Sequence, residues 1–203
     1  MNRLGLMHPS TLAGRYATEA RALYEAFSRD SAGEHDAYFT TKLPSTGALI
    51  GPWGVMLHTP TIGRAYLDLS NAVRHSGELS GKLSEICSLA VCRQEGVQYA
   101  VYSHRLLALK EGLTELQIQA VLNGGCPLNV AAPERVVYFV SRELCANSGS
   151  LTQRTWDIAI ETLGREAART LVHLVALFRY EATIMRGFDV QVPPERDRIE
   201  AIR

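Results

Sequence analysis

The sequence predicts an all-α protein, a single-domain helical bundle. Apolar residues recur at spacings of three and four along most of the 203-residue chain, which is the period of amphipathic helices. No pair of short alternating segments joined by a turn dipeptide predicts a β-hairpin. The chain is long enough to bury one full-sized core, and it contains no low-complexity linker that would divide it.

The first half of the chain predicts two helices separated by a long loop. Residues 12–27 have apolar side chains at helical spacing, and residues 61–74 form the next predicted helix. Between them, residues 42–60 are rich in glycine and proline and have room for one helical turn. Loops of this length are often functional.

Three later segments carry the same helix-start signal, a leucine followed by a hydroxyl residue. Serine or threonine at this position can accept a hydrogen bond from a free backbone N–H, and the leucine can pack against the first turn. These pairs are Leu79-Ser80, Leu113-Thr114 and Leu151-Thr152. Thr114 and Gln117 together predict a complete capping box.

Proline and glycine mark the ends of the last helices. Pro133 is expected to begin a helix, because proline is favoured in the first turn. Gly164 is expected to end the helix that follows Thr152. A long final helix is predicted over residues 165–185.

Composition excludes several classes of function. The chain has 21 basic and 21 acidic residues, so its charge gives no reason to expect nucleic acid or an anionic membrane as a partner. No apolar run approaches the ~18 residues of a membrane span, and the N-terminal residues do not resemble a secretory signal. We therefore expect a cytoplasmic location.

The four cysteines do not predict a metal or redox site. Cys87, Cys92, Cys126 and Cys145 include no C-x-x-C pair, and no histidine lies at zinc-finger spacing from them. Free cysteine is often a small core residue. We expect no bound metal and no cofactor.

Glu85 and His104 are the strongest candidates for chemistry. They lie at equal distances on either side of a predicted helix break at Glu95-Gly96. Two antiparallel helices would bring them level, each about 14 Å from the turn, whereas one straight helix would hold them about 28 Å apart. The helix around Glu85 is mostly apolar, and a carboxylate there needs a partner. A paired histidine and glutamate in such a setting can transfer protons near neutral pH.

At these positions the sequence resembles the carboxymuconolactone decarboxylase and alkylhydroperoxidase D-like superfamily. The residues that match its core motif are Glu85, Gly96, Tyr99, His104, Ala108 and the cap Gly112-Leu113-Thr114. The Gly51-Pro52-Trp53 and Leu57-His58-Thr59-Pro60 segments are similar to the loop of its longer, decarboxylase-like members. The resemblance implies a helical extension over residues 1–40, a decarboxylase-like domain over 41–194 and a charged tail over 195–203.

The sequence departs from the peroxidase branch of this superfamily. Members of that branch carry a C-x-x-C motif just before the histidine, and the matching positions here are Val97 and Ala100. Without a pair of thiols there is no resolving disulfide, so thiol peroxidase activity is not expected.

The resemblance implies a cofactor-free lyase that acts on a small carboxylated or lactone-like metabolite. In this reading His104 is the proton donor and Glu85 fixes its tautomer, while Trp53, His58 and Tyr99 bind the substrate. An isomerase or dehydratase that uses the same pair, a catalytically silent binding protein, and a purely structural Glu85–His104 pair are the alternatives. The superfamily resemblance also implies a homo-oligomer, a trimer or hexamer, which agrees with the strongly apolar segment 171–178.

Overall fold

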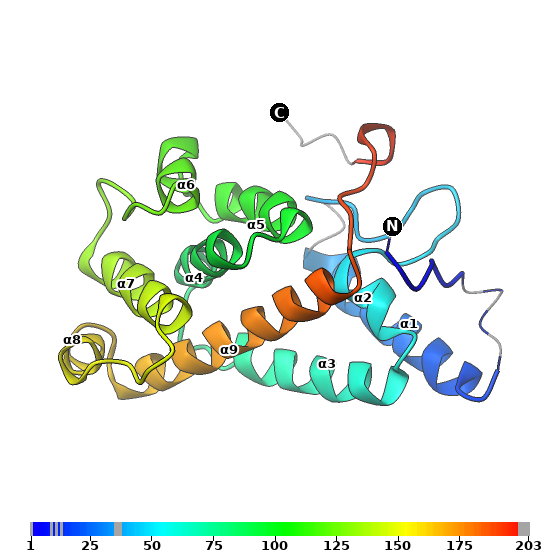
Figure 1. The fold of residues 1–203 in the computed structure, drawn as a ribbon, viewed down its shortest axis with the longest axis horizontal. Helices are drawn as coiled ribbons and strands as arrows, with labels where there is room; N and C mark the ends of the chain where they lie inside the picture. The colour runs from blue at the N-terminus through cyan, green and yellow to red at the C-terminus, as the bar shows by residue number, and fades with distance from the viewer. Residues whose placement is uncertain (1, 9, 11, 13, 35–37, 199–203) are drawn as a thin grey trace.

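The computed structural model describes residues 2–8, 10, 12, 14–34 and 38–198, and it confirms the all-α fold (Figure 1). Within these residues the only β pairing is an isolated bridge between Lys42 and Leu49. The helices are α1 (Ala17–Glu34), α2 (Gly51–Met56), α3 (Pro60–Arg74), α4 (Gly81–Glu95), α5 (Gln98–Lys110), α6 (Glu115–Leu122), α7 (Ala132–Ala146), α8 (Gln153–Leu163), α9 (Arg165–Gly187) and a short 3-10 turn, η2 (Glu195–Asp197).

Helix α4 lies at the centre of the bundle and packs against α5, α6, α7 and α9. Every residue from Glu85 to Cys92 is buried, which accounts for the apolar character of this helix on all sides. The long helix α9 crosses the molecule from α8 to α2 and also contacts α3, so it connects the two ends of the bundle (Figure 1).

The predicted break between α4 and α5 is confirmed. Ser80 caps the start of α4 by accepting a hydrogen bond from Leu83 N. Gly96 ends the helix with a left-handed backbone (φ 68°), and its N–H donates to the carbonyl of Cys92 (2.9 Å). A left-handed residue at this place favours glycine, and the chain then turns directly into α5.

The other predicted caps are also present. Thr114 and Gln117 form the full capping box of α6, and Thr152 accepts a hydrogen bond from Thr155 N at the start of α8. Gly164 separates α8 from α9.

Helix α1 differs from the predicted range of 12–27. It begins at Ala17, after a turn in which Gly14 has a positive φ of 92°. It continues to Glu34 because the polar residues after Phe27 are compatible with a helix. Leu23 and Phe27 belong to the same core cluster as residues of α4 and α9.

The loop before α3 is ordered, and α2 is its single short helix. A bridge between Lys42 and Leu49 closes the first part of the loop, and Ala48, Leu49 and Ile50 are buried. This anchoring directs Trp53 toward the interior. The domain boundaries proposed at residues 40 and 194 stay predictions. Within the predicted charged tail, residues 199–203 lie outside the described part of the chain.

Across the part of the chain that the structure describes, no helix combines the length and the apolar character that a membrane crossing requires.

Candidate active site

The Glu85 and His104 side chains are in contact, as the hairpin geometry predicts. Nδ1 of His104, on α5, lies 2.9 Å from Oε2 of Glu85, on α4. Both side chains are less than 10% exposed, at 8% for His104 and 7% for Glu85. Because an ionised carboxylate only accepts hydrogen bonds, this contact places a proton on Nδ1 and leaves Nε2 as the reactive nitrogen.

His104 faces a cavity, and Glu85 supports it from behind. The imidazole is among the side chains that line the cavity, whereas Glu85 is not. The ring of Phe178, on α9, packs against the imidazole edge-to-face with a centroid distance of 5.1 Å. The ring is therefore fixed by a carboxylate and by an aromatic side chain.

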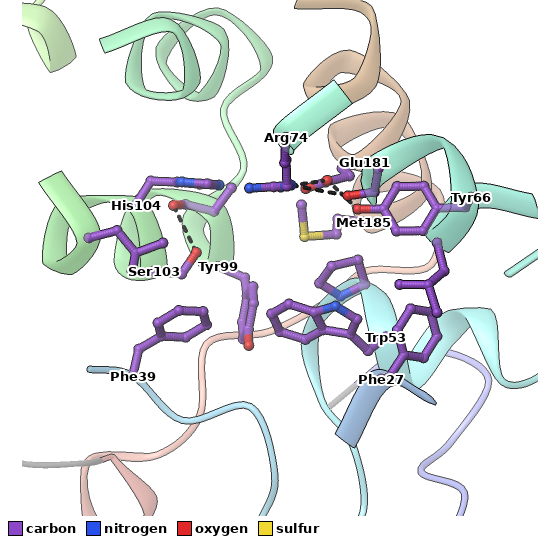
Figure 2. A pocket seen from close by; sticks show the side chains of 15 residues that line it. Phe27, Phe39, Trp53, Tyr66, Arg74, Tyr99, Ser103, His104, Glu181 and Met185 are labelled. Carbon is purple, nitrogen blue, oxygen red and sulfur yellow. Dashed lines mark hydrogen bonds and ion pairs between the residues drawn. The ribbon is translucent and has the colours of Figure 1, made fainter. Parts of the chain in front are cut away.

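The cavity has one polar wall and one aromatic wall (Figure 2). In the view of Figure 2, His104, Arg74, Glu181 and Tyr66 follow one another along the upper side, and Phe39, Tyr99, Trp53 and Phe27 lie below them. Water-sized molecules can occupy about 30 Å³ of the interior. This is room for about two water molecules.

Trp53 and Tyr99, which are two of the three predicted substrate-binding residues, both line this cavity. The ring of Trp53 stacks on Phe39 with a centroid distance of 6.0 Å. The hydroxyl of Tyr99 donates to the carbonyl of Thr40 (3.0 Å). Its ring, more than its hydroxyl, is thus presented to the interior.

His58 is placed elsewhere. It is not among the residues that line the cavity, and its Nε2 pairs with the carbonyl of Gly5 (3.1 Å) at the surface. The loop turns after α2, so the His58 side chain contacts the N-terminal segment and does not face His104.

A second polar cluster on the cavity wall was not predicted from the sequence. Tyr66 and Arg74, on α3, both reach Glu181, on α9. The phenol of Tyr66 donates a hydrogen bond to Glu181 Oε1, and Nη2 of Arg74 lies 3.3 Å from the same oxygen. Glu181 is 7% exposed, so its carboxylate requires these partners.

Burial and the neighbouring charges fix the protonation states of Tyr66 and Arg74. Burial, followed by the charge of Glu181, raises the pKa of Tyr66 well above its ordinary value, so the phenol stays protonated. Burial alone would lower the pKa of Arg74, but Glu181 and its neighbours outweigh this effect and raise it. Arg74 therefore carries a full positive charge beside the cavity.

The sequence does contain a signal for Glu181. On α9 the buried residues recur at three- and four-residue spacing, and the stripe includes an acidic member: Leu171, Leu174, Phe178, Glu181 and Met185. A carboxylate in an apolar stripe indicates a buried partner. No comparable signal marks Arg74, which is the last residue of α3 and has the ordinary position of a basic residue at a helix end.

The cysteines lie away from the cavity. None of the four lines it, and Cys87, Cys92 and Cys145 are buried in the core. Burial raises the pKa of Cys87 to about 12, so its thiol is unreactive at neutral pH. Among the described residues, no three His, Cys, Asp or Glu side chains are grouped closely enough to hold a metal ion.

Part of the chain is similar to a known family. Residues 60–137 match the model of the Carboxymuconolactone decarboxylase family. The resemblance to the carboxymuconolactone decarboxylase and alkylhydroperoxidase D-like superfamily is confirmed. The matched segment runs from the start of α3 into α7, and it includes Arg74, Glu85 and His104. Trp53 and Glu181 lie outside it.

Solved structures share the fold of this chain. A protein from Ralstonia eutropha JMP134, described as an alkylhydroperoxidase AhpD core and an uncharacterized peroxidase-related protein, superposes with a TM-score of 0.74 at 14% identity, over 96% of this chain and 93% of its own. The debrominase Bmp8 superposes with a TM-score of 0.67 at 14% identity, over 87% of this chain and 88% of its own. A Bmp8 variant in complex with 2,3,4-tribromopyrrole gives 0.65 at 12% identity, over 89% of each chain. No curated protein matches the chain.

Proposed function

We propose that the protein is a cofactor-free lyase of the carboxymuconolactone decarboxylase type, acting on a small carboxylated or lactone-like metabolite. The observation that carries this proposal is the Glu85–His104 pair, which is buried and hydrogen-bonded at 2.9 Å, with His104 in the wall of a cavity. Similarity of residues 60–137 to the decarboxylase family supports the reaction type.

The proposed reaction uses the pair for proton transfer. The carbon–carboxylate bond of the substrate breaks, carbon dioxide leaves, and the electron pair moves onto a conjugated carbonyl to form an enolate. In this step His104 begins as the imidazolium and donates its Nε2 proton to the carbon, which leaves a neutral imidazole that takes a proton back from water at Nε2. Glu85 accepts the Nδ1 hydrogen bond throughout and stabilises the imidazolium form, in the role that the acidic member of a catalytic triad performs.

The aromatic wall is suited to the flat, apolar part of a substrate. Trp53 and Tyr99 line the cavity with aromatic rings, and the space of about 30 Å³ for water-sized molecules is smaller than any such ligand. Substrate entry therefore requires the wall to move.

The test is turnover by His104→Gln. Carboxymuconolactone and a panel of lactone acids and β-keto acids would be incubated with the protein, and release of carbon dioxide would be followed. We expect a loss of about 10²-fold or more in His104→Gln, because general acid catalysis contributes about this much. His58→Gln is the matched control and should retain wild-type turnover, since His58 lies outside the cavity. A folded His104→Gln protein with undiminished turnover would remove the proposed mechanism.

We further propose that the protein works in the cytoplasm as a homo-oligomer, with the trimer as the first expectation. The outer face of α9 supports this: Val172 and Tyr180 are 36% and 39% exposed, although both are large apolar or aromatic side chains. Light scattering that shows a stable monomer at micromolar concentration would contradict the oligomer.

A further inference from the structure

We infer that Arg74 is the anchor for a carboxylate group of the substrate, beside the proton-donating His104. This inference rests on the proposed function and defines its substrate class: a flat carboxylic acid. Three features of the described residues lead to it, namely the charge of Arg74, its uncommitted donors and its position next to His104.

The charge and hydrogen bonds of Arg74 leave it able to bind a ligand. Nε donates to Oγ of Ser70 (3.1 Å), and Nη2 donates to Glu181 (3.3 Å). Tyr66 is a further neighbour that helps to raise the pKa of Arg74, and among the described residues no hydrogen bond of adequate geometry uses Nη1. A guanidinium has five N–H donors in a planar fork, and the unused edge matches a carboxylate.

The position of Arg74 places such a carboxylate close to the reacting nitrogen. The guanidinium carbon lies 5.2 Å from the centroid of Phe178, the same ring that packs against the His104 imidazole. Both side chains line the cavity, and in Figure 2 they extend toward each other along its polar wall. A ligand held by Arg74 would thus lie within the cavity with its body next to His104.

The other charged groups of the wall do not compete for this role. Glu181 already accepts from Tyr66 and Arg74, while Glu85 lies behind the wall and is paired with His104. The cationic donor presented to a ligand is therefore Arg74. The opposite wall is aromatic, so the remainder of the ligand is expected to be flat and apolar.

A purely structural ion pair that joins α3 to α9 is the competing explanation of Arg74. Binding experiments separate the two, because a structural pair would not discriminate between ligands. The probes are 2-furoate and 2-furamide, which are flat five-membered rings of similar shape that differ in charge. We expect the wild-type protein to bind 2-furoate saturably in calorimetry and at least about tenfold more tightly than 2-furamide, since a charge-assisted pair contributes at least this much.

Variants of Arg74 then test whether this side chain causes the preference for the charged probe. Arg74→Gln should lower the affinity for 2-furoate about tenfold or more and leave that for 2-furamide unchanged. Arg74→Lys keeps the charge beside Glu181 but loses the planar guanidinium, so it should also bind 2-furoate more weakly. This variant tests the inference even if Arg74→Gln does not fold. Arg64→Gln is the matched control, because Arg64 is an exposed residue of the same helix that pairs with Asp68, and its affinity should equal that of the wild type.

Two results would overturn the inference. One is equal affinity, or no binding, of the two probes in the wild-type protein, and the other is unchanged 2-furoate binding in a folded Arg74 variant. Failure of the lyase proposal is recognised separately. In that case His104→Gln would not affect turnover, whereas the discrimination between 2-furoate and 2-furamide would still depend on Arg74.

Discussion

Tyr66 and Glu181 are 115 residues apart in the sequence, yet the phenol of Tyr66 donates a hydrogen bond to the Glu181 carboxylate inside the protein. The bond joins α3 to α9 at the wall of the cavity. It also holds the carboxylate that faces Arg74, so one interaction contributes both to the packing of the two helices and to the geometry of the site.

This bond predicts the effect of Tyr66→Phe. The variant leaves a buried carboxylate with one partner fewer, and we expect the free energy of unfolding to fall by about 1–3 kcal/mol. Urea unfolding followed by circular dichroism measures the change. Tyr16→Phe is the control, because Tyr16 is 46% exposed and should show no loss. Equal stability of the two variants would mean that the Tyr66 bond contributes nothing to the fold.

Gly51, at the start of α2, is predicted to be intolerant of alanine. Its φ is +67°, and a Cβ atom added there would lie 2.5 Å from Cε1 of Tyr99, whose buried ring cannot move freely. Gly51→Ala should cost about 1–3 kcal/mol of stability and displace the ring of Tyr99.

Gly77→Ala separates the two expected causes of the stability loss in Gly51→Ala, which are backbone strain and the close contact with Tyr99. Gly77 also has a positive φ, +78°, but nothing lies within 4 Å of its added Cβ. This control should show only the backbone strain, of about 1 kcal/mol. If both variants lose the same stability in urea unfolding, the close contact with Tyr99 is not important.

The sequence predicts the α4–α5 hairpin and its Glu85–His104 contact because both depend on local signals. Gly96 and the Ser80 cap fix the two helices, and the spacing along them fixes which side chains meet. The Arg74–Glu181 pair could not be predicted in this way. Its residues are separated by 107 positions, and they meet only because α3 packs against α9.

The loop before α3 shows the same limit at shorter range. Its glycines and prolines predict a turn-rich segment, but the direction of each side chain depends on what the loop packs against. Trp53 faces the cavity, whereas His58, five residues later, faces Gly5. The sequence pattern alone gave these two residues the same role.

Alkylation of the thiols is predicted to leave activity intact. Cys126 is the only one of the four cysteines that is not buried, so iodoacetamide should modify it first in the native protein. Cys87, Cys92 and Cys145 should react only after unfolding. Mass spectrometry of the modified protein and a turnover assay test this, with Cys126→Ser as the control that should resist modification. Inactivation that coincides with alkylation would indicate thiol chemistry at the site.

Stability is predicted to fall at alkaline pH because of the buried thiols. Burial raises the pKa of Cys87 to about 12 and that of Cys145 to about 11, whereas a thiol in an unfolded chain titrates near 8.5. Their contribution to stability is thus complete below about pH 8.5 and is lost as the pH rises toward the folded-state values. Between these limits unfolding releases about one proton per thiol, and the free energy of unfolding falls by about 1.4 kcal/mol per pH unit for each.

Substitution of one thiol isolates its share of this slope. Cys87→Ser removes the titrating group with little change in volume, so the slope of unfolding free energy against pH should become shallower by about one proton. Urea unfolding between pH 8.5 and 10 measures this slope. In this range tyrosine contributes little, because folded Tyr66 has a raised pKa and stays protonated, and tyrosine in the unfolded chain titrates only near pH 10. Cys145→Ser should give a similar change, because its thiol also keeps its proton in the folded protein over this range. Slopes that match the wild type in both variants would show that the buried thiols do not control alkaline stability.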